Sequence, residues 1–172
     1  MTTDLKPAMP DGGGAIDKVS TFLWFDGEAE AAAEFYTGLF PDSRIDRVTR
    51  TPMDYPGGNE GDAITVAFTL SGRSFIAMNG GPDHPFTDAI SLSIDCADQD
   101  EVDQYWNALG QGGVPVACGW IRDRFGLSWQ VTPRILPQLL SDPDRAKSKR
   151  VMEAMVQMVK IDVAAIEAAA KE

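Results

Sequence analysis

Histidine and cysteine are nearly absent from this chain, and their scarcity limits its chemistry. The 172 residues include one histidine, His84, and two cysteines, Cys96 and Cys118. Two cysteines cannot form the disulfide framework of a small secreted domain, so the composition favours the reducing cytoplasm. One histidine excludes a histidine-rich metal site within a single chain.

Basic side chains and long apolar runs are scarce as well. Fifteen Lys and Arg residues against 26 Asp and Glu residues leave a net charge of -11 and an isoelectric point near 4.4. Such a surface repels phosphates, so we expect neither a nucleic-acid partner nor an anionic membrane. No apolar run approaches the ~20 residues of a membrane-spanning helix. The start of the sequence also lacks the apolar stretch of a secretory signal.

The apolar content is nevertheless sufficient for one folded domain. Hydrophobic residues make up 44% of the chain and charged residues 24%, as in ordinary globular proteins. Residues 1–17 contain two prolines and a run of three glycines, and we expect a flexible tail there. The folded part of the chain is predicted to begin at residue 18.

A strand, a helix and three further strands are predicted twice along the chain. Aromatic and β-branched residues at 19–25 are typical of a strand, and apolar residues at helical spacing in 28–40 indicate a helix. In the second half, Asp98 and Glu101 form a capping-box pattern that begins a helix. The predicted strands are 19–25, 45–51, 63–70 and 74–78, and then 90–95, 114–118, 120–122 and 127–132.

The two halves also resemble each other in sequence. Leu23–Asp26 corresponds to Leu92–Asp95, 69 residues later, and the aromatic pair at Phe35 corresponds to the pair at Tyr105, 70 residues later. Because neither half can enclose a core alone, we expect them to pack as one domain, residues 18–133. The predicted fold class is α+β, with two tandem βαβββ units. These units, about 18–81 and 89–133, should form a curved mixed sheet around a shared cavity, with the helices outside.

The rest of the chain, residues 134–172, is predicted to be a helical extension. A short apolar turn or helix over 134–140 precedes a helix over 145–160, and Asp162 can cap a last helix that runs through residue 170. The extension is expected to pack on the chain's own domain or on a dimer mate, and a partner-binding surface is a further alternative. The apolar stripe of the middle helix comprises Val151, Met152, Met155, Met158 and Val159.

Five stretches carry more specific motifs: Leu23–Gly27, Phe35–Ser43, Met78–Pro82, Cys118–Trp120 and Asp123–Pro133. Together with the duplicated unit, they resemble the glyoxalase/bleomycin-resistance (vicinal oxygen chelate) superfamily. Within it they resemble the PhnB-like branch, whose members are often labelled 3-demethylubiquinone-9 3-methyltransferases. The resemblance extends over residues 18–160, and it implies a homodimer.

Superfamily enzymes typically hold a divalent metal in the cavity through His and Glu side chains from the first and last strands of each unit. The matching positions here are Ser20, Ala89, Gln130 and either Ile76 or Met78. Alanine cannot bind a metal, and serine and glutamine are poor ligands for such ions. We therefore expect no metal and no cofactor.

Strand alternation predicts which side chains line the cavity. An aromatic wall and a second wall of hydroxyls and an amide suit a small, largely apolar organic ligand. The alternative is that these polar groups bond only to one another or to water. The expected cavity residues are Ser20, Phe22, Trp24, Ser91, Ser93, Gln130 and Cys118.

No catalytic residue can be assigned from the sequence. Cys118 is either a nucleophile or, like Cys96, a small packing residue. Asp26 and Asp95 hold equivalent positions in the repeat, where they suit either acid–base chemistry or a turn.

Three functions are therefore considered. The first is binding of a small molecule without catalysis, and the second is a metal-independent enzyme acting on such a molecule. The third is the methyltransferase of the family label. Neither Gly57–Gly61 nor Gly110–Gly113 lies between a strand and a following helix, where the common class of S-adenosylmethionine enzymes has its glycine-rich loop.

Overall fold

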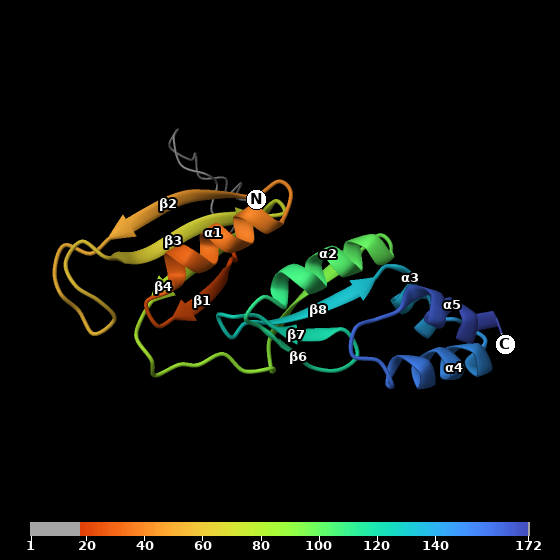
Figure 1. The fold of residues 1–172 in the computed structure, drawn as a ribbon. Coiled ribbons are helices and arrows are strands. Elements are labelled where there is room, and N and C mark those ends of the chain that lie inside the picture. The colour runs from red at the N-terminus through yellow and green to blue at the C-terminus, as the bar shows by residue number, and fades with distance from the viewer. Residues whose placement is uncertain (1–17, 172) are drawn as a thin grey trace, which may run out of the picture. The chain divides into compact units, whose positions relative to one another are not determined.

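The computed structural model describes residues 18–171, which divide into two compact units between His84 and Pro85 (Figure 1). Each unit contains an open, four-stranded mixed sheet with a helix packed against it, so the predicted α+β class and the duplicated βαβββ unit are confirmed. The predicted tail, residues 1–17, lies outside the described residues. Within those residues, no helix has the length and apolar character needed to cross a membrane.

The first unit consists of β1 (Thr21–Phe25), α1 (Ala29–Leu39), β2 (Arg44–Arg50), β3 (Ala63–Leu70) and β4 (Arg73–Asn79). Its strands pair in the order β1-β4-β3-β2, with β1 parallel to β4 and the other neighbours antiparallel. The predicted β3–β4 hairpin turns at Ser71 and Gly72, whose φ angles are 45° and 76°. Two successive residues with positive φ give the tight turn whose twist matches that of the flanking strands.

Helix α1 packs on its sheet through small residues and is fixed at its start by a strand residue. Ala29, Ala32 and Ala33 are fully buried, which allows the helix to approach the sheet closely. The N-cap residue Glu28 makes no side-chain capping bond. Instead, the backbone N–H of Ala29 donates to Oδ1 of Asn79 at 2.8 Å, and Nδ2 of Asn79 donates to the carbonyl of Ala63 at 2.8 Å. One buried amide thus joins α1, β3 and β4.

The second unit repeats this arrangement with β5 (Ser91–Cys96), α2 (Gln99–Leu109), β6 (Val114–Pro115), β7 (Trp120–Arg122) and β8 (Ser128–Pro133). Its strands pair in the order β5-β8-β7-β6, with β5 parallel to β8. The predicted cap is present, because Oδ1 of Asp98 accepts the backbone N–H of Glu101 at 3.0 Å. Figure 1 shows α2 lying along this sheet, as α1 does in the first unit.

The predicted strand over 114–118 is wrong beyond Pro115, where β6 ends. Cys118 and Gly119 have positive φ angles of 55° and 82°, which a strand cannot contain. Their backbone N–H groups donate to the carbonyls of Met158 and Val159 at 2.8 Å. The loop before β7 therefore turns toward the C-terminal segment of its own unit.

The C-terminal extension contains α3 (Ile135–Leu140), α4 (Arg145–Met155) and α5 (Val163–Lys171). Leu136, Val151, Ile161 and Ile166 form its buried core, which belongs to the second unit (Figure 1, blue). Asp162 caps α5 as predicted, since its Oδ1 accepts the N–H of Ala165 at 2.9 Å.

The predicted helix over 145–160 is wrong at its end, because α4 stops at Met155. The chain turns there so that the carbonyls of Met158 and Val159 can accept the bonds from the loop before β7. The predicted apolar stripe is consequently divided. Val151 is fully buried, whereas Met152 and Val159 are 45% and 51% exposed.

Candidate functional site

The sheet of the first unit has one face that α1 does not cover, which we call the first helix-free face. Leu23 and Phe25 are buried, so alternation along β1 places Phe22 and Trp24 on the opposite side, as predicted. Phe22 is 53% exposed. Ile76 pairs with Phe22 and Met78 pairs with Trp24 across β1 and β4, and both are half-buried. The first helix-free face is therefore apolar and accessible within its unit.

The Trp24 indole is held in one position by the segment after β4. Its Nε1 donates to the carbonyl of Gly81 at 2.8 Å. The ring of His84 lies edge-on to it, with ring centroids 4.7 Å apart. A Cβ at Gly80 would overlap the indole ring, so this position requires glycine. A fixed aromatic ring is a suitable contact for a planar or apolar ligand because little side-chain entropy is lost on binding.

The loop between β2 and β3 is fixed to the end of β4 by Tyr55. The hydroxyl of Tyr55 donates to the carbonyl of Asn79 at 2.8 Å. Burial, with a smaller contribution from Asp62, raises the pKa of the Tyr55 phenol above its ordinary value. The phenol therefore stays protonated and remains a donor at neutral pH.

The second unit has a corresponding helix-free face, which is polar. Ser91, Ser93 and Gln130 lie on it because Ile94 and Val131 are buried on the side of α2. Gln130 pairs with Ser93, and its Nε2 donates to Oγ of Ser91 at 2.9 Å. The structure thus brings two predicted site residues, Ser91 and Gln130, into direct contact. Hydrogen bonding between the polar site residues themselves was the alternative to ligand binding in the sequence analysis.

Three residues at this second helix-free face were not predicted from the sequence: Trp120, Arg122 and Asp88. Trp120 pairs with Gln130, and Arg122 pairs with Ser128. Nη2 of Arg122 lies 3.1 Å from both carboxylate oxygens of Asp88, and Oγ of Ser128 donates to the same carboxylate at 2.6 Å. The hydrogen bond from Ser128 and then that from Arg122 lower the pKa of Asp88. The three-residue strand β7 is too short for alternation alone to assign its faces.

Comparison with known proteins identifies the family. A family described as 3-demethylubiquinone-9 3-methyltransferase matches residues 17–132. A PhnB protein from Bacillus cereus is 36% identical over 68% of this chain and 99% of its own, with a TM-score of 0.62. The chain belongs to this PhnB family. A protein from Pseudomonas aeruginosa, 19% identical over 64% of this chain and 92% of its own with a TM-score of 0.53, shares the fold. Among curated proteins, none matches.

The family match ends before the C-terminal extension begins. Residues 17–132 include both βαβββ units, whereas α3, α4 and α5 all follow residue 132. Both helix-free faces therefore belong to the part of the chain shared with the PhnB family. The extension is an addition to it in this chain.

The remaining predicted site residues, Ser20 and Cys118, lie outside the strands. Ser20 is half-buried and comes directly before β1. Cys118 is half-buried in the loop before β7 rather than on a strand. Cys96 is fully buried, and burial is the main cause that raises its pKa to about 12. Its thiol is thus protonated at neutral pH, in agreement with the interpretation of Cys96 as a packing residue.

The acidic residues do not gather into a metal site within the described part of the chain. No group of three or more His, Cys, Asp or Glu side chains in residues 18–171 is arranged to hold a metal ion. Asp95 forms an ion pair with Arg134 at 2.8 Å instead. What the two faces offer is an apolar surface with a fixed indole and a polar surface with an amide, hydroxyls and an ion pair.

Proposed function

We propose that this PhnB-family protein binds a small, largely apolar organic molecule on a helix-free sheet face, without a metal ion. The observation that carries this proposal is the fixed indole of Trp24 beside Phe22, Ile76 and Met78. Apolar side chains that stay exposed on a sheet cost free energy unless something covers them, and they are common in binding sites.

The polar face supports the same proposal from the second unit. Gln130 gives an amide N–H to Ser91, while its carbonyl oxygen and the Ser93 hydroxyl have no hydrogen bond among the described side chains. A ligand with one or two polar groups would find an acceptor and a donor here. Loss of such a bond typically costs about 0.5–1.5 kcal/mol of binding free energy.

The first experiment is a ligand screen on the whole chain, read by ligand-observed NMR with S-adenosylmethionine included. Trp24→Leu should weaken a bound molecule by at least about tenfold, because an aromatic contact and its buried area are lost. Trp106→Leu is the matched control, since Trp106 lies on helix α2 of the second unit and not on a helix-free sheet face. Equal affinity of the wild type and Trp24→Leu would overturn the assignment of the site to this face.

The family description favours one second candidate, the 3-demethylubiquinone-9 3-methyltransferase. The glycines at 57–61 lie between β2 and β3, and those at 110–113 follow α2, so neither group begins a helix after a strand. The sheets are mixed rather than doubly wound and parallel. Saturable binding of S-adenosylmethionine would support this candidate, and no binding at millimolar concentration would eliminate it.

Catalysis without a metal is the other alternative to simple binding. A ligand recovered unchanged after prolonged incubation supports binding alone, whereas a converted ligand supports an enzyme. We also propose that the protein acts in the cytoplasm as a homodimer, as its two cysteines and its resemblance to dimeric relatives led us to expect.

A further inference from the structure

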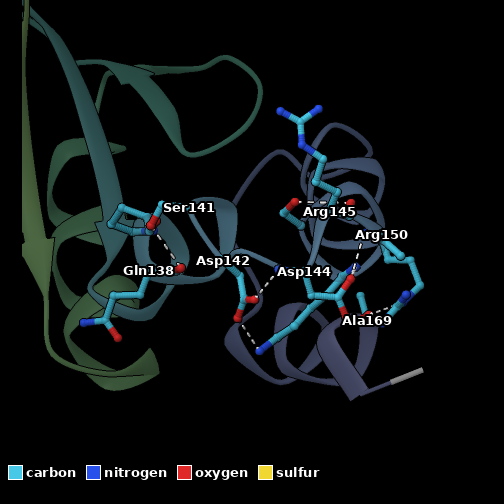
Figure 2. Close-up of polar contacts among 11 residues, drawn as sticks. Gln138, Ser141, Asp142, Asp144, Arg145, Arg150 and Ala169 are labelled. Atoms are coloured by element: carbon cyan, nitrogen blue, oxygen red, sulfur yellow. Dashed lines mark hydrogen bonds and ion pairs between the residues drawn. The ribbon is translucent and has the colours of Figure 1, made fainter.

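Helix α4 concentrates the basic side chains of an acidic protein. Four of the 15 Lys and Arg residues fall within residues 145–150, although the chain carries a net charge of -11. Two of these four side chains already bind groups of the same unit. Nζ of Lys147 lies 2.7 Å from Oδ2 of Asp142, and Nε of Arg150 donates to the carbonyl of Ala169 at 3.1 Å (Figure 2).

The other two basic side chains, Arg145 and Lys149, are one helical turn apart and exposed. Within residues 18–171, no ion pair or side-chain hydrogen bond engages the guanidinium of Arg145, and Figure 2 shows it pointing away from the Asp142–Lys147 pair. Lys149 lies 3.5 Å from Glu153 in a pair that is exposed on both sides. Such a surface pair contributes little, so Lys149 can exchange this partner for a ligand.

A pocket of about 400 Å³ adjoins these two cations, and its lining is partly apolar. Leu140 is half-buried and Met152 is 45% exposed, so both present hydrocarbon to the pocket. Ser141 and Ser148 also line the pocket. The pocket is open to solvent but its volume lies within the range of small-molecule sites, and a lining of both cations and hydrocarbon matches a ligand that is anionic and partly apolar.

One carboxylate in the lining, that of Asp142, is already neutralised. The hydrogen bond from Lys147 and that from the backbone N–H of Asp144 lower the pKa of Asp142, so the group stays ionised and paired. This leaves two further cations in the lining, Arg145 and Lys149, of which Lys149 has only its exposed pair with Glu153. Two adjacent cations in a protein that is otherwise negative attract an anion rather than a second cation.

We propose that this pocket binds a small anionic amphiphile. The anionic head lies between Arg145 and Lys149, and a short alkyl chain lies on Leu140 and Met152. The site is built from α3 and α4, which follow the part of the chain that matches the PhnB family. It is therefore a separate binding function carried by the extension, independent of the helix-free faces.

The test uses octanoate as the probe and backbone amide NMR of the full chain as the measurement. Octanoate should shift amides between residues 140 and 152 in a saturable way. Arg145→Gln combined with Lys149→Gln should weaken binding by at least about tenfold, since two charge-assisted bonds are lost. Met152→Gln should weaken it by a smaller factor of about three, because only part of the apolar contact is lost.

The matched control is Arg47→Gln combined with Arg73→Gln, which removes the same charge from two exposed arginines of the first unit. It should leave the octanoate affinity unchanged, and an equal loss in this control would overturn the proposal by showing a general charge effect. Octanol binding as tightly as octanoate, or inorganic phosphate binding as tightly, would also overturn it. If octanoate shifts the Trp24 indole instead, this proposal fails while the proposed function gains support.

Discussion

The carboxylate of Asp123 accepts the indole N–H of Trp129 at 2.8 Å, and both side chains are buried in the second unit. The other carboxylate oxygen accepts the backbone N–H groups of Phe125 and Leu127 at 2.9 and 3.0 Å. A single buried side chain therefore fixes both the turn between β7 and β8 and the tryptophan that β8 presents to the core.

Asp123→Asn should destabilise the protein by about 1–3 kcal/mol, because three donors converge on this carboxylate and an amide can accept from only one side. The measurement is the free energy of unfolding in urea. Asp83→Asn, at an exposed position, is the control and should change it by less than about 0.5 kcal/mol. An Asp123→Asn variant as stable as the wild type would refute this role.

Asn79 has a comparable role in the first unit. Replacing it with alanine leaves the N–H of Ala29 and the carbonyl of Ala63 without their side-chain partner. We expect a loss of about 1–3 kcal/mol in the free energy of unfolding. Asn107→Ala, on the exposed side of α2, should be nearly neutral, and similar losses in both variants would contradict the capping role.

Gly119 joins the loop before β7 to the C-terminal extension, and a side chain there should loosen that junction. A Cβ would lie 2.8 Å from the carbonyl oxygen of Val131 and 3.1 Å from Cγ1 of Ile161, at a φ of 82°. Gly126→Ala is the matched control, because its φ is 87° but its nearest contact is 3.8 Å away. Gly126→Ala should lower the free energy of unfolding by about 1–2 kcal/mol through backbone strain alone. Gly119→Ala should cost clearly more, and equal losses would disprove the steric argument.

The buried thiol of Cys96 should make the free energy of unfolding depend on pH in the alkaline range. Its pKa rises from 9.0 to about 12 on folding, mainly through burial, so the folded state favours the neutral thiol. The stabilisation is fully present below pH 9 and is lost as the pH rises toward 12. The difference in unfolding free energy between the wild type and Cys96→Ala should therefore shrink over this range. A constant difference would show that the thiol does not titrate with folding.

Oligomeric state is a separate prediction. Sedimentation velocity at micromolar concentration should show a homodimer, as the resemblance to the PhnB-like branch implies, and the chain exposes Val114, Val116 and Val156 at 43–57%. A single monomer peak at that concentration would contradict it.

Local sequence patterns were sufficient to predict the duplicated unit and most of its elements. The residue types in 63–70 predicted β3 with its observed ends, and the Asp98–Glu101 pair predicted the start of α2. Glu101 departs from the ideal box, because its Oε2 accepts the N–H of Ala97 rather than that of Asp98. Such features depend on neighbours within a few residues, which is why periodicity and capping chemistry can find them.

The errors arise where distant segments determine the structure. The early end of α4 depends on hydrogen bonds between Met158–Val159 and Cys118–Gly119, about 40 residues apart along the chain. Trp120 and Arg122 were missed because only the register of β7 against β8 places them beside Gln130 and Ser128. Strand alternation did place Phe22 and Trp24 on the side of the sheet opposite α1, since β1 is long enough for its buried residues to define its faces.

Native mass spectrometry of the protein purified from cells tests whether the helix-free face around Trp24 holds a small molecule. We expect a mass that includes a small organic molecule in the wild type and in Trp106→Leu, and its loss or marked reduction in Trp24→Leu. The same added mass in Trp24→Leu as in the wild type would contradict the claim that the helix-free face around Trp24 holds the ligand.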